Sequence, residues 1–143
     1  MVTPGVTNVE RLEAAGRSSA EQRNVATVRA IFEAFARSDF TVLRTNLAAS
    51  GTTWVIGLTP ERLGERANDP SMVPNLFCNG MHFDIKQAGA EGDRVFVEWE
   101  DEALTSGGKI YRNTGVSIFR FDTAGKVESY HEYIDPANFF AVL

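Results

Sequence analysis

Residues 94–135 read RVFVEWEDEALTSGGKIYRNTGVSIFRFDTAGKVESYHEYID and contain the most regular pattern in the chain. From Arg94 to Glu102 apolar and polar residues alternate, which is typical of a strand with one buried face. Turns follow at residues 105–108 and 122–125, each with the glycine that a tight reversal requires. The pattern predicts three consecutive antiparallel strands, over residues 94–102, 109–121 and 126–135.

An aspartate lies at the end of an otherwise apolar face on two of these strands. The face of Val95, Val97 and Trp99 ends at Asp101. If the alternation continues along the last strand, one face carries Val127, Ser129, His131, Tyr133 and Asp135. A carboxylate in an apolar pocket loses solvation, so its pKa rises. When two carboxylates share one pocket, their two pKa values move further apart, because ionising one disfavours ionising the other. We therefore predict that Asp101 and Asp135 share one proton, as a neutral acid beside an ionised base.

The chain before this sheet begins with a polar segment and then becomes helical. Residues 1–18 have mixed composition and no sustained period, which predicts a flexible N-terminal arm. Ser19 and Gln22 resemble a capping box, and the apolar residues that follow recur at intervals of three and four. This pattern predicts an amphipathic helix that ends near Arg37.

The middle of the chain predicts shorter elements. A second helix is expected at 40–48 and a short strand at 52–57. Residues 58–79 contain three prolines, which permit only short helices, and we expect this segment to be a lid or cavity wall. Further short elements are expected at 61–66 and 71–77 (helices), 81–88 (strand) and 136–143 (a tail).

The composition is that of one soluble globular domain. The chain has 143 residues, of which 43% are hydrophobic and 23% charged, and no apolar run is long enough to span a membrane. A net charge of -5 without a basic cluster argues against nucleic acid as a partner. Cys78 is the single cysteine, so we expect a cytoplasmic protein. The two histidines each have an aspartate nearby, in the scattered pairs His82 with Asp84 and His131 with Asp135, and such pairs are common by chance, so we expect no metal. We also expect no cofactor.

The order of these elements resembles a known superfamily. Two helices, a strand with Trp54, an irregular segment and four strands ending in Tyr133-Ile134-Asp135 are similar to the nuclear transport factor two-like proteins. That superfamily includes ketosteroid isomerase, SnoaL-like polyketide cyclases and limonene epoxide hydrolase. The resemblance covers residues 22–143 and is strongest from Glu98 to Asp135, in the register of the epoxide hydrolase branch.

The resemblance implies an α+β fold. A cone-shaped, curled sheet of mixed or antiparallel strands would pack on the N-terminal helices and enclose an apolar pocket, as one SnoaL-like barrel domain over residues 19–143. Such proteins are commonly homodimers, so a homodimer is expected here.

The resemblance also implies roles for the two aspartates. In the epoxide hydrolase branch, the residue at the place of Asp101 donates a proton to the epoxide oxygen. The residue at the place of Asp135 is the base that activates water. That branch has an arginine two residues before the first aspartate, where this chain has Trp99. Its early strand carries a tyrosine and an asparagine, where this chain has Trp54 and Ile56.

Other side chains are expected to line the pocket. His131 is the candidate proton-transfer partner of Asp135. Candidate substrate-binding residues are Trp54, Trp99, Tyr133, Phe32, Tyr111, Asn113 and Phe77. Whether Tyr111, Asn113 and Ser117 face the pocket stays open, because Gly115 could mark a bulge that reverses the alternation.

These observations favour a small-molecule enzyme with aspartate acid–base chemistry, similar to an epoxide hydrolase, which adds water to a hydrophobic epoxide. A SnoaL-like cyclase or an isomerase like ketosteroid isomerase is the alternative among enzymes. A non-catalytic module for ligand binding or dimerisation is the alternative outside enzymes. An aromatic-lined pocket suits a terpenoid, a steroid or a polyketide.

Overall fold

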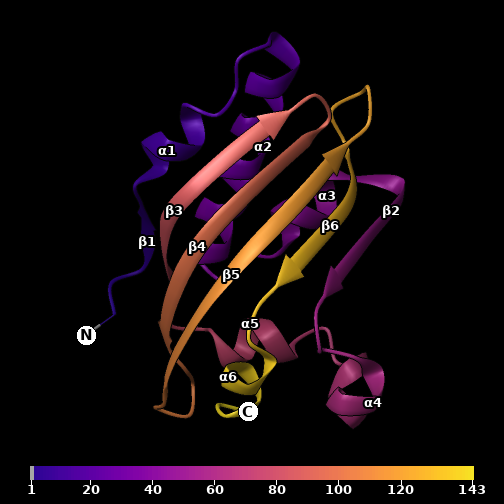
Figure 1. Ribbon diagram of the computed structural model, residues 1–143. Coiled ribbons are helices and arrows are strands. Elements are labelled where there is room, and N and C mark those ends of the chain that lie inside the picture. The colour runs from indigo at the N-terminus through magenta and orange to yellow at the C-terminus, as the bar shows by residue number, and fades with distance from the viewer. Residues whose placement is uncertain (1) are drawn as a thin grey trace.

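The computed structural model describes residues 2–143 and contains one curled, open sheet with helices on one face (Figure 1). The strands lie in the order β1-β3-β4-β5-β6-β2, and β3 to β6 pair antiparallel. The two outermost strands, β1 and β2, pair parallel with β3 and β6. The bounds are β1 Gly5–Thr7, β2 Leu47–Val55, β3 His82–Glu91, β4 Arg94–Leu104, β5 Ile110–Phe121 and β6 Val127–Tyr133. The predicted α+β fold with a mixed sheet is confirmed.

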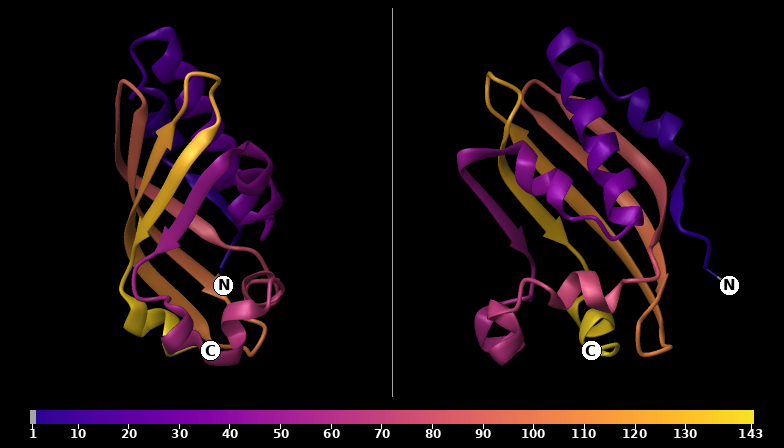
Figure 2. Two further views of the ribbon diagram at one scale, coloured as in Figure 1. Left: turned by 90° about the vertical axis from the view of Figure 1, so that its right-hand side faces the viewer. Right: turned by 180° about the vertical axis from the view of Figure 1, so that it is seen from behind.

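Two consecutive helices, α2 (Ser19–Ala36) and α3 (Thr41–Asn46), cover the inner face of the sheet (Figure 2). The capping box of α2 is made by Ser18 and Glu21, one residue earlier than predicted. The predicted apolar stripe is buried, with Val25, Val28, Ile31, Phe32 and Phe35 at most 5% exposed. Within residues 2–143, no helix combines the length and the apolar character that crossing a membrane requires.

The proline-containing segment lies at one end of the sheet beside the C-terminal helix α6 (Pro136–Phe140) (Figure 2). It forms the short helices α4 (Pro60–Leu63) and α5 (Met72–Leu76), with the 3-10 helix η1 (Gly64–Asn68) between them. The guanidinium of Arg62 lies 4.6 Å from the centre of the Phe140 ring, which joins α4 to α6.

The N-terminal segment is predicted as a flexible arm over residues 1–18, but its described residues, 2–18, include a strand and a helix that pack on the sheet; Met1 lies outside the described residues. Strand β1 extends the sheet beyond β3, and the following helix α1 (Val9–Glu13) buries Leu12 completely. The Arg11 guanidinium donates hydrogen bonds to the carbonyls of Ile85 and Lys86, at 3.1 and 3.0 Å. A three-residue strand and a one-turn helix are too short to show a period, which is why the sequence pattern concealed them.

A bulge in β6 decides which of its side chains face inward. Phe121 pairs with Val127 and Arg120 pairs with Ser129, so Glu128 is an extra residue in the strand. The alternation is therefore shifted after Glu128. Beyond it, Tyr130 and Glu132 point inward, and the predicted inward face of His131, Tyr133 and Asp135 is wrong.

Candidate active site

A cavity of about 330 Å³ lies between the inner face of the sheet and the helices α2, α3, α5 and α6. This volume is at the small end of the range for sites that bind small molecules. Most of its wall is apolar and includes Phe35, Leu43, Val73, Phe77, Phe83 and Phe139. Four polar side chains, Asp101, Tyr111, Tyr130 and Glu132, converge on it from three neighbouring strands, and Arg44 of α3 and Thr53 of β2 also line it. An apolar cavity with a few ionisable groups is the arrangement expected of an acid–base site.

Asp101, predicted as a catalytic residue, lies in this cavity. It is 7% exposed, and its Oδ1 atom has no hydrogen-bond partner among residues 2–143. Burial raises the pKa of the Asp101 carboxyl to about 8, and the nearby Glu132 charge adds to the rise, against the lowering effect of the Asn113 and Asp101 backbone amides. Asp101 is therefore mainly protonated at neutral pH.

Glu132 is the second carboxyl group of the cavity. Burial raises its pKa, while the hydrogen bond that it accepts from the Tyr130 hydroxyl lowers it. Two close carboxyl groups do not ionise together, because the first negative charge disfavours the second. The Glu132 charge is among the causes that raise the pKa of Asp101, and Glu132 accepts from a phenol donor, so Glu132 is the group that ionises first.

Two tyrosines place hydroxyl groups beside the carboxyl pair. Burial raises the pKa of Tyr111 and of Tyr130, so both stay neutral at physiological pH. The Asn113 side-chain amide donates to the Tyr111 hydroxyl oxygen at 2.8 Å. This contact leaves the Tyr111 hydroxyl hydrogen free to donate to another group.

Asp135 lies outside this cavity and is exposed to solvent. Its carboxylate accepts from the Ala137 backbone N–H at 3.0 Å and caps α6. Asn113 holds the Asp135 backbone through two hydrogen bonds of 3.0 Å. The prediction that Asp101 and Asp135 share a proton in an apolar pocket is wrong, because solvent and the helix cap surround the second carboxylate.

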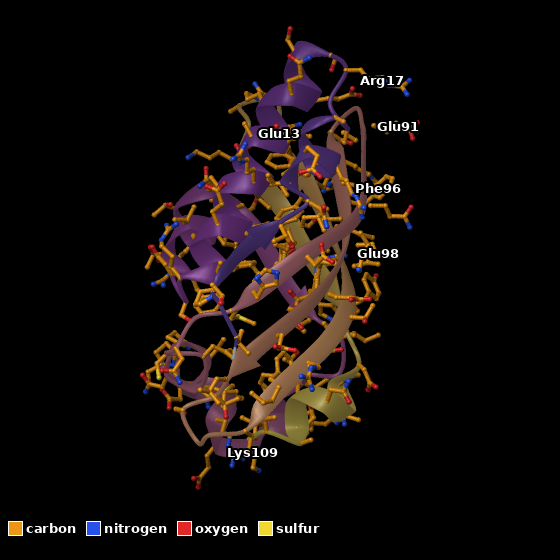
Figure 3. All side chains as sticks on the ribbon, turned by 90° about the vertical axis from the view of Figure 1, so that its left-hand side faces the viewer. Glu13, Arg17, Glu91, Phe96, Glu98 and Lys109 are labelled. Carbon is orange, nitrogen blue, oxygen red and sulfur yellow. The ribbon has the colours of Figure 1, made fainter. Side chains whose placement is uncertain are left out.

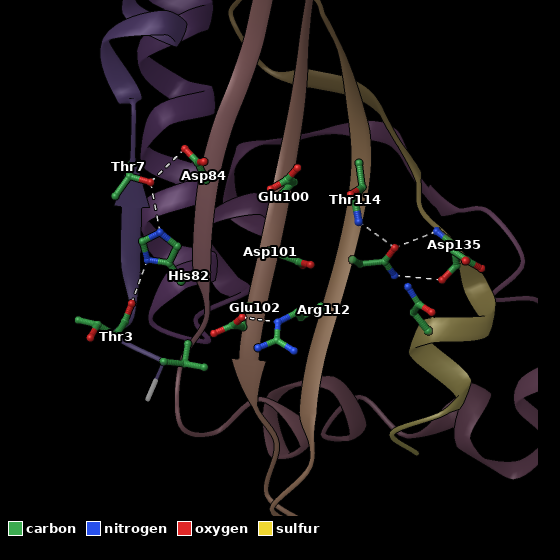
Figure 4. A pocket seen from close by; sticks show the side chains of 13 residues that line it. Thr3, Thr7, His82, Asp84, Glu100, Asp101, Glu102, Arg112, Thr114 and Asp135 are labelled. Atoms are coloured by element: carbon green, nitrogen blue, oxygen red, sulfur yellow. Dashed lines mark hydrogen bonds and ion pairs between the residues drawn. The ribbon is translucent and has the colours of Figure 1, made fainter.

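Both aspartates do border an open groove of about 810 Å³ on the outer side of the sheet (Figure 4). Its other charged residues include Asp84, Glu102 and Arg112, so it is not the predicted apolar pocket. Among residues 2–143, no three His, Cys, Asp or Glu side chains are grouped closely enough to hold a metal ion.

The predicted site residues His131, Trp54 and Tyr133 lie together on the outer face of the sheet, away from the cavity. The Trp54 ring is 5.4 Å from the His131 ring and 5.2 Å from the Tyr133 ring, measured between centroids. Trp54 is 43% exposed and Tyr133 40% exposed. Phe96 and Glu98, also on this outer face, point away from the helices (Figure 3). The bulge at Glu128 is the reason that His131 and Tyr133 face outward.

Trp99 and Phe32, predicted to line the pocket, are instead core residues at 1% exposure each. The indole N–H of Trp99 donates to the Ser117 hydroxyl oxygen at 3.0 Å. A Cβ atom at Gly115 would lie 2.6 Å from the Trp99 ring, so only glycine admits the indole here. The pairing of β4 and β5 is continuous across this glycine, which excludes a bulge at Gly115.

Because β5 alternates without interruption, Tyr111, Asn113 and Ser117 all face inward, which settles the alternative left open above. Tyr111 and Phe77 line the cavity as predicted, with ring centroids 5.1 Å apart. Asn113 lies behind Tyr111 and does not border the cavity.

The sequence prediction missed Tyr130 and Glu132. The signal that could have found them is a second alternation on β6, in which Tyr130, Glu132 and Ile134 follow each other at every second residue. It places one carboxylate between two apolar residues. A strand with two competing alternations indicates a bulge between them.

The comparisons with known proteins agree with this fold. The profile of the SnoaL-like domain family matches residues 28–130. This match covers most of the chain, so the protein belongs to the SnoaL-like domain family. Among curated proteins, no sequence matches the chain.

Solved structures with the same fold carry several assigned activities. A protein assigned as a SnoaL-like polyketide cyclase from Jannaschia sp. CCS1 has a TM-score of 0.66 and 16% identity, over 88% of this chain and 94% of that one. An LEH-like epoxide hydrolase from M. tuberculosis has a TM-score of 0.62 and 18% identity, over 86% and 90%. A protein assigned as a hydroxylase from Streptomyces galilaeus, AclR, has a TM-score of 0.65 and 16% identity, over 85% and 80%. Identities this low establish the fold and not the reaction.

Proposed function

We propose that this SnoaL-like protein is a cofactor-independent enzyme that moves protons on a hydrophobic carbonyl compound, as an isomerase or a cyclase. Asp101 is the acid and Glu132 is the base. The observation that carries the proposal is the pair itself, two carboxyl groups of different proton affinity in one apolar cavity. Such a pair supplies a proton donor and a proton acceptor at the same pH.

In the proposed reaction the carbonyl oxygen of the substrate accepts hydrogen bonds from the Asp101 carboxyl and the Tyr111 hydroxyl. Glu132 takes a proton from the carbon next to the carbonyl, and the electron pair of that C–H bond forms the enol. In an isomerase Glu132 returns the proton to a different carbon. In a cyclase the enol carbon attacks a second carbonyl of the same molecule. The enol hydroxyl then returns its proton to Asp101, and the new alkoxide takes the proton held by Glu132. The apolar wall strengthens each of these electrostatic contacts.

Epoxide hydration is the second candidate, supported by the likeness of the fold to the M. tuberculosis enzyme. There Asp101 would protonate the epoxide oxygen and Glu132 would activate a water. This reaction requires groups that hold the water, and Trp54 faces outward while Ile56 has no hydrogen-bonding side chain. Trp99, at the place of the expected arginine, is buried against Ser117. These residues favour the carbonyl reaction.

The experiment that tests the proposal measures proton exchange. The protein is incubated in D₂O with hydrophobic enones and β-diketones, and NMR follows deuterium at the carbon next to the carbonyl. We expect exchange above the buffer rate that is lost in Glu132→Gln and retained in Asp135→Asn. Formation of a labelled diol from an epoxide in ¹⁸O-water, without exchange on any carbonyl compound, would establish the hydrolase instead. A cavity that binds such ligands and turns over none of them would support the non-catalytic module.

We also propose that the protein is a homodimer. Four neighbouring side chains cross the outer face of β4, β5, β6 and β2 in one row, which consists of Phe96, Ile118, His131 and Trp54. Phe96 is 45% exposed and Trp54 is 43% exposed. An exposed apolar row on a sheet is a feature of surfaces that pair with another protein, and a second copy would cover it.

A further inference from the structure

A chain of hydrogen bonds runs through the core from β4 to Glu132. The Trp99 indole N–H donates to the Ser117 hydroxyl oxygen at 3.0 Å, and the Ser117 and Tyr130 hydroxyl oxygens lie 3.3 Å apart. The Tyr130 hydroxyl donates to the Glu132 carboxylate. Trp99, Ser117 and Tyr130 are 1%, 0% and 4% exposed, so water does not compete for these bonds.

The chemistry of the end groups gives this chain a direction. An indole N–H can only donate, and an ionised carboxylate can only accept. Within residues 2–143, the Ser117 and Tyr130 hydroxyl groups have no other hydrogen-bond partners. Three hydrogens therefore serve three bonds when Ser117 donates to Tyr130 and Tyr130 donates to Glu132. Every hydrogen points toward the carboxylate.

A proton on Glu132 would disturb this arrangement. On Oε1 it would have to donate to the Tyr130 oxygen, which reverses the chain and leaves the Ser117 hydrogen without an acceptor among residues 2–143. On Oε2 it would turn the acceptor of Tyr130 from a carboxylate into a neutral carboxyl group, which accepts a weaker hydrogen bond. The chain therefore favours the ionised form and leaves Oε2 as the oxygen that is open to the cavity.

We propose that Trp99, Ser117 and Tyr130 are positioning residues that hold Glu132 ionised, with Oε2 as the atom that accepts the proton of the substrate. The proposal deepens the function given above and rests on it. It also explains why two similar carboxyl groups take different roles, because Asp101 Oδ1 has no such donor.

The other ionisable groups around the cavity act alongside this chain. Asp101 faces Glu132 from β4, Tyr111 faces it from β5, and Arg44 of α3 lines the same cavity. Asp101 is mainly protonated at neutral pH and adds no charge there, whereas the Arg44 charge favours ionisation of Glu132. Any test must therefore change the hydrogen-bond chain without changing these charges.

The test is a ¹³C NMR pH titration of the Glu132 and Asp101 carboxyl carbons, in the unaltered protein, Ser117→Ala, Trp99→Phe and Tyr130→Phe. None of these substitutions changes a charge at neutral pH. We expect Glu132 to titrate at higher pH in all three variants, with the largest shift in Tyr130→Phe because that variant removes the direct donor. The acid limb of the pH–rate profile should move to higher pH with it, and turnover at pH 6 should fall about tenfold in Ser117→Ala.

Val95→Ala is the control for general loosening of the core. Val95 is fully buried on β4 and makes no contact in this chain of hydrogen bonds. It should lower the melting temperature without moving the titration of Glu132. An unchanged Glu132 titration in both Ser117→Ala and Trp99→Phe, or a shift of equal size in Val95→Ala, would overturn the proposal. The titrations need no substrate, so a protein that fails every carbonyl assay yet shows these shifts would refute the proposed function alone.

Discussion

The two faces of the β4–β6 sheet carry similar residue types in very different states. On the inner face, Asp101 is buried and its pKa is raised to about 8. Asp135, beyond the end of β6, is exposed and its carboxylate serves as a helix cap. In β6 itself, Glu132 faces the cavity and its neighbour His131 faces outward. The surroundings of each side chain, and with them its proton affinity, thus follow from its position relative to the sheet and not from its residue type.

On β6 the bulge at Glu128 determines which side chains face inward. One single-residue deletion, of His131, should reverse the inward face, and another, of Glu128, should leave it unchanged. Deletion of His131 should have the largest effect, because it moves Glu132 outward and forces Tyr133 into the core. We expect no activity and a fall of at least about 3 kcal/mol in the free energy of unfolding. Deletion of Glu128 removes only the extra residue and keeps the inward face, at a cost of about 1 kcal/mol including the Arg120 ion pair. Urea unfolding and deuterium exchange on a carbonyl substrate measure both effects.

The next largest difference should separate two adjacent side chains on opposite faces. Glu132→Gln removes the base, and we expect exchange to fall by about 10²- to 10⁴-fold. His131→Gln changes only the outer face and should leave the rate within about twofold. Steady-state kinetics at pH 7 compare the two variants. Equal losses in both would place the base elsewhere.

Asp101→Asn and Asp135→Asn should differ in how they change the free energy of unfolding with pH, because the first carboxyl group is buried and the second is exposed. The folded protein holds the Asp101 proton up to a pH of about 8, and the unfolded chain releases it near 3.8. The free energy of unfolding therefore falls as the pH rises through this window. Asp101→Asn avoids this loss, so at pH 8 we expect it to be more stable by about 2 kcal/mol, or roughly 4–8 °C. The gain should vanish near pH 4, and thermal melts of Asp135→Asn should show no such trend.

A substitution on the outer face should have the smallest effect on the stability of one subunit. Ile118→Lys places a charge in the row of Phe96, Ile118, His131 and Trp54. We expect a change of less than about 0.5 kcal/mol in the stability of one subunit, because the residue does not face the core. Analytical ultracentrifugation should show a dimer for the unaltered protein and a monomer for this variant. A dimer in both would move the interface to another surface.

The sequence predicted the elements after residue 18 well because their patterns are local. Regular alternation placed Asp101 on an inward face correctly, since no irregularity precedes it in β4, whereas the direction of Tyr111 was settled only by the continuous pairing of β4 and β5. Alternation failed after Glu128, because a bulge is set by pairing with a neighbouring strand and leaves only a weak trace in the strand itself. Trp99 was misplaced for a related reason: alternation gives the face of a residue, but not whether packing leaves space beside it.

The parallel pairing of β1 with β3 has a consequence for solubility. Without β1, the backbone groups of β3 between His82 and Asp84 that point away from β4 would lack partners at the edge of the sheet. An unprotected edge strand can pair with the same strand of another molecule, and this is a common start of aggregation. Strand β1 covers this edge of β3, and with three residues it presents only a short edge of its own.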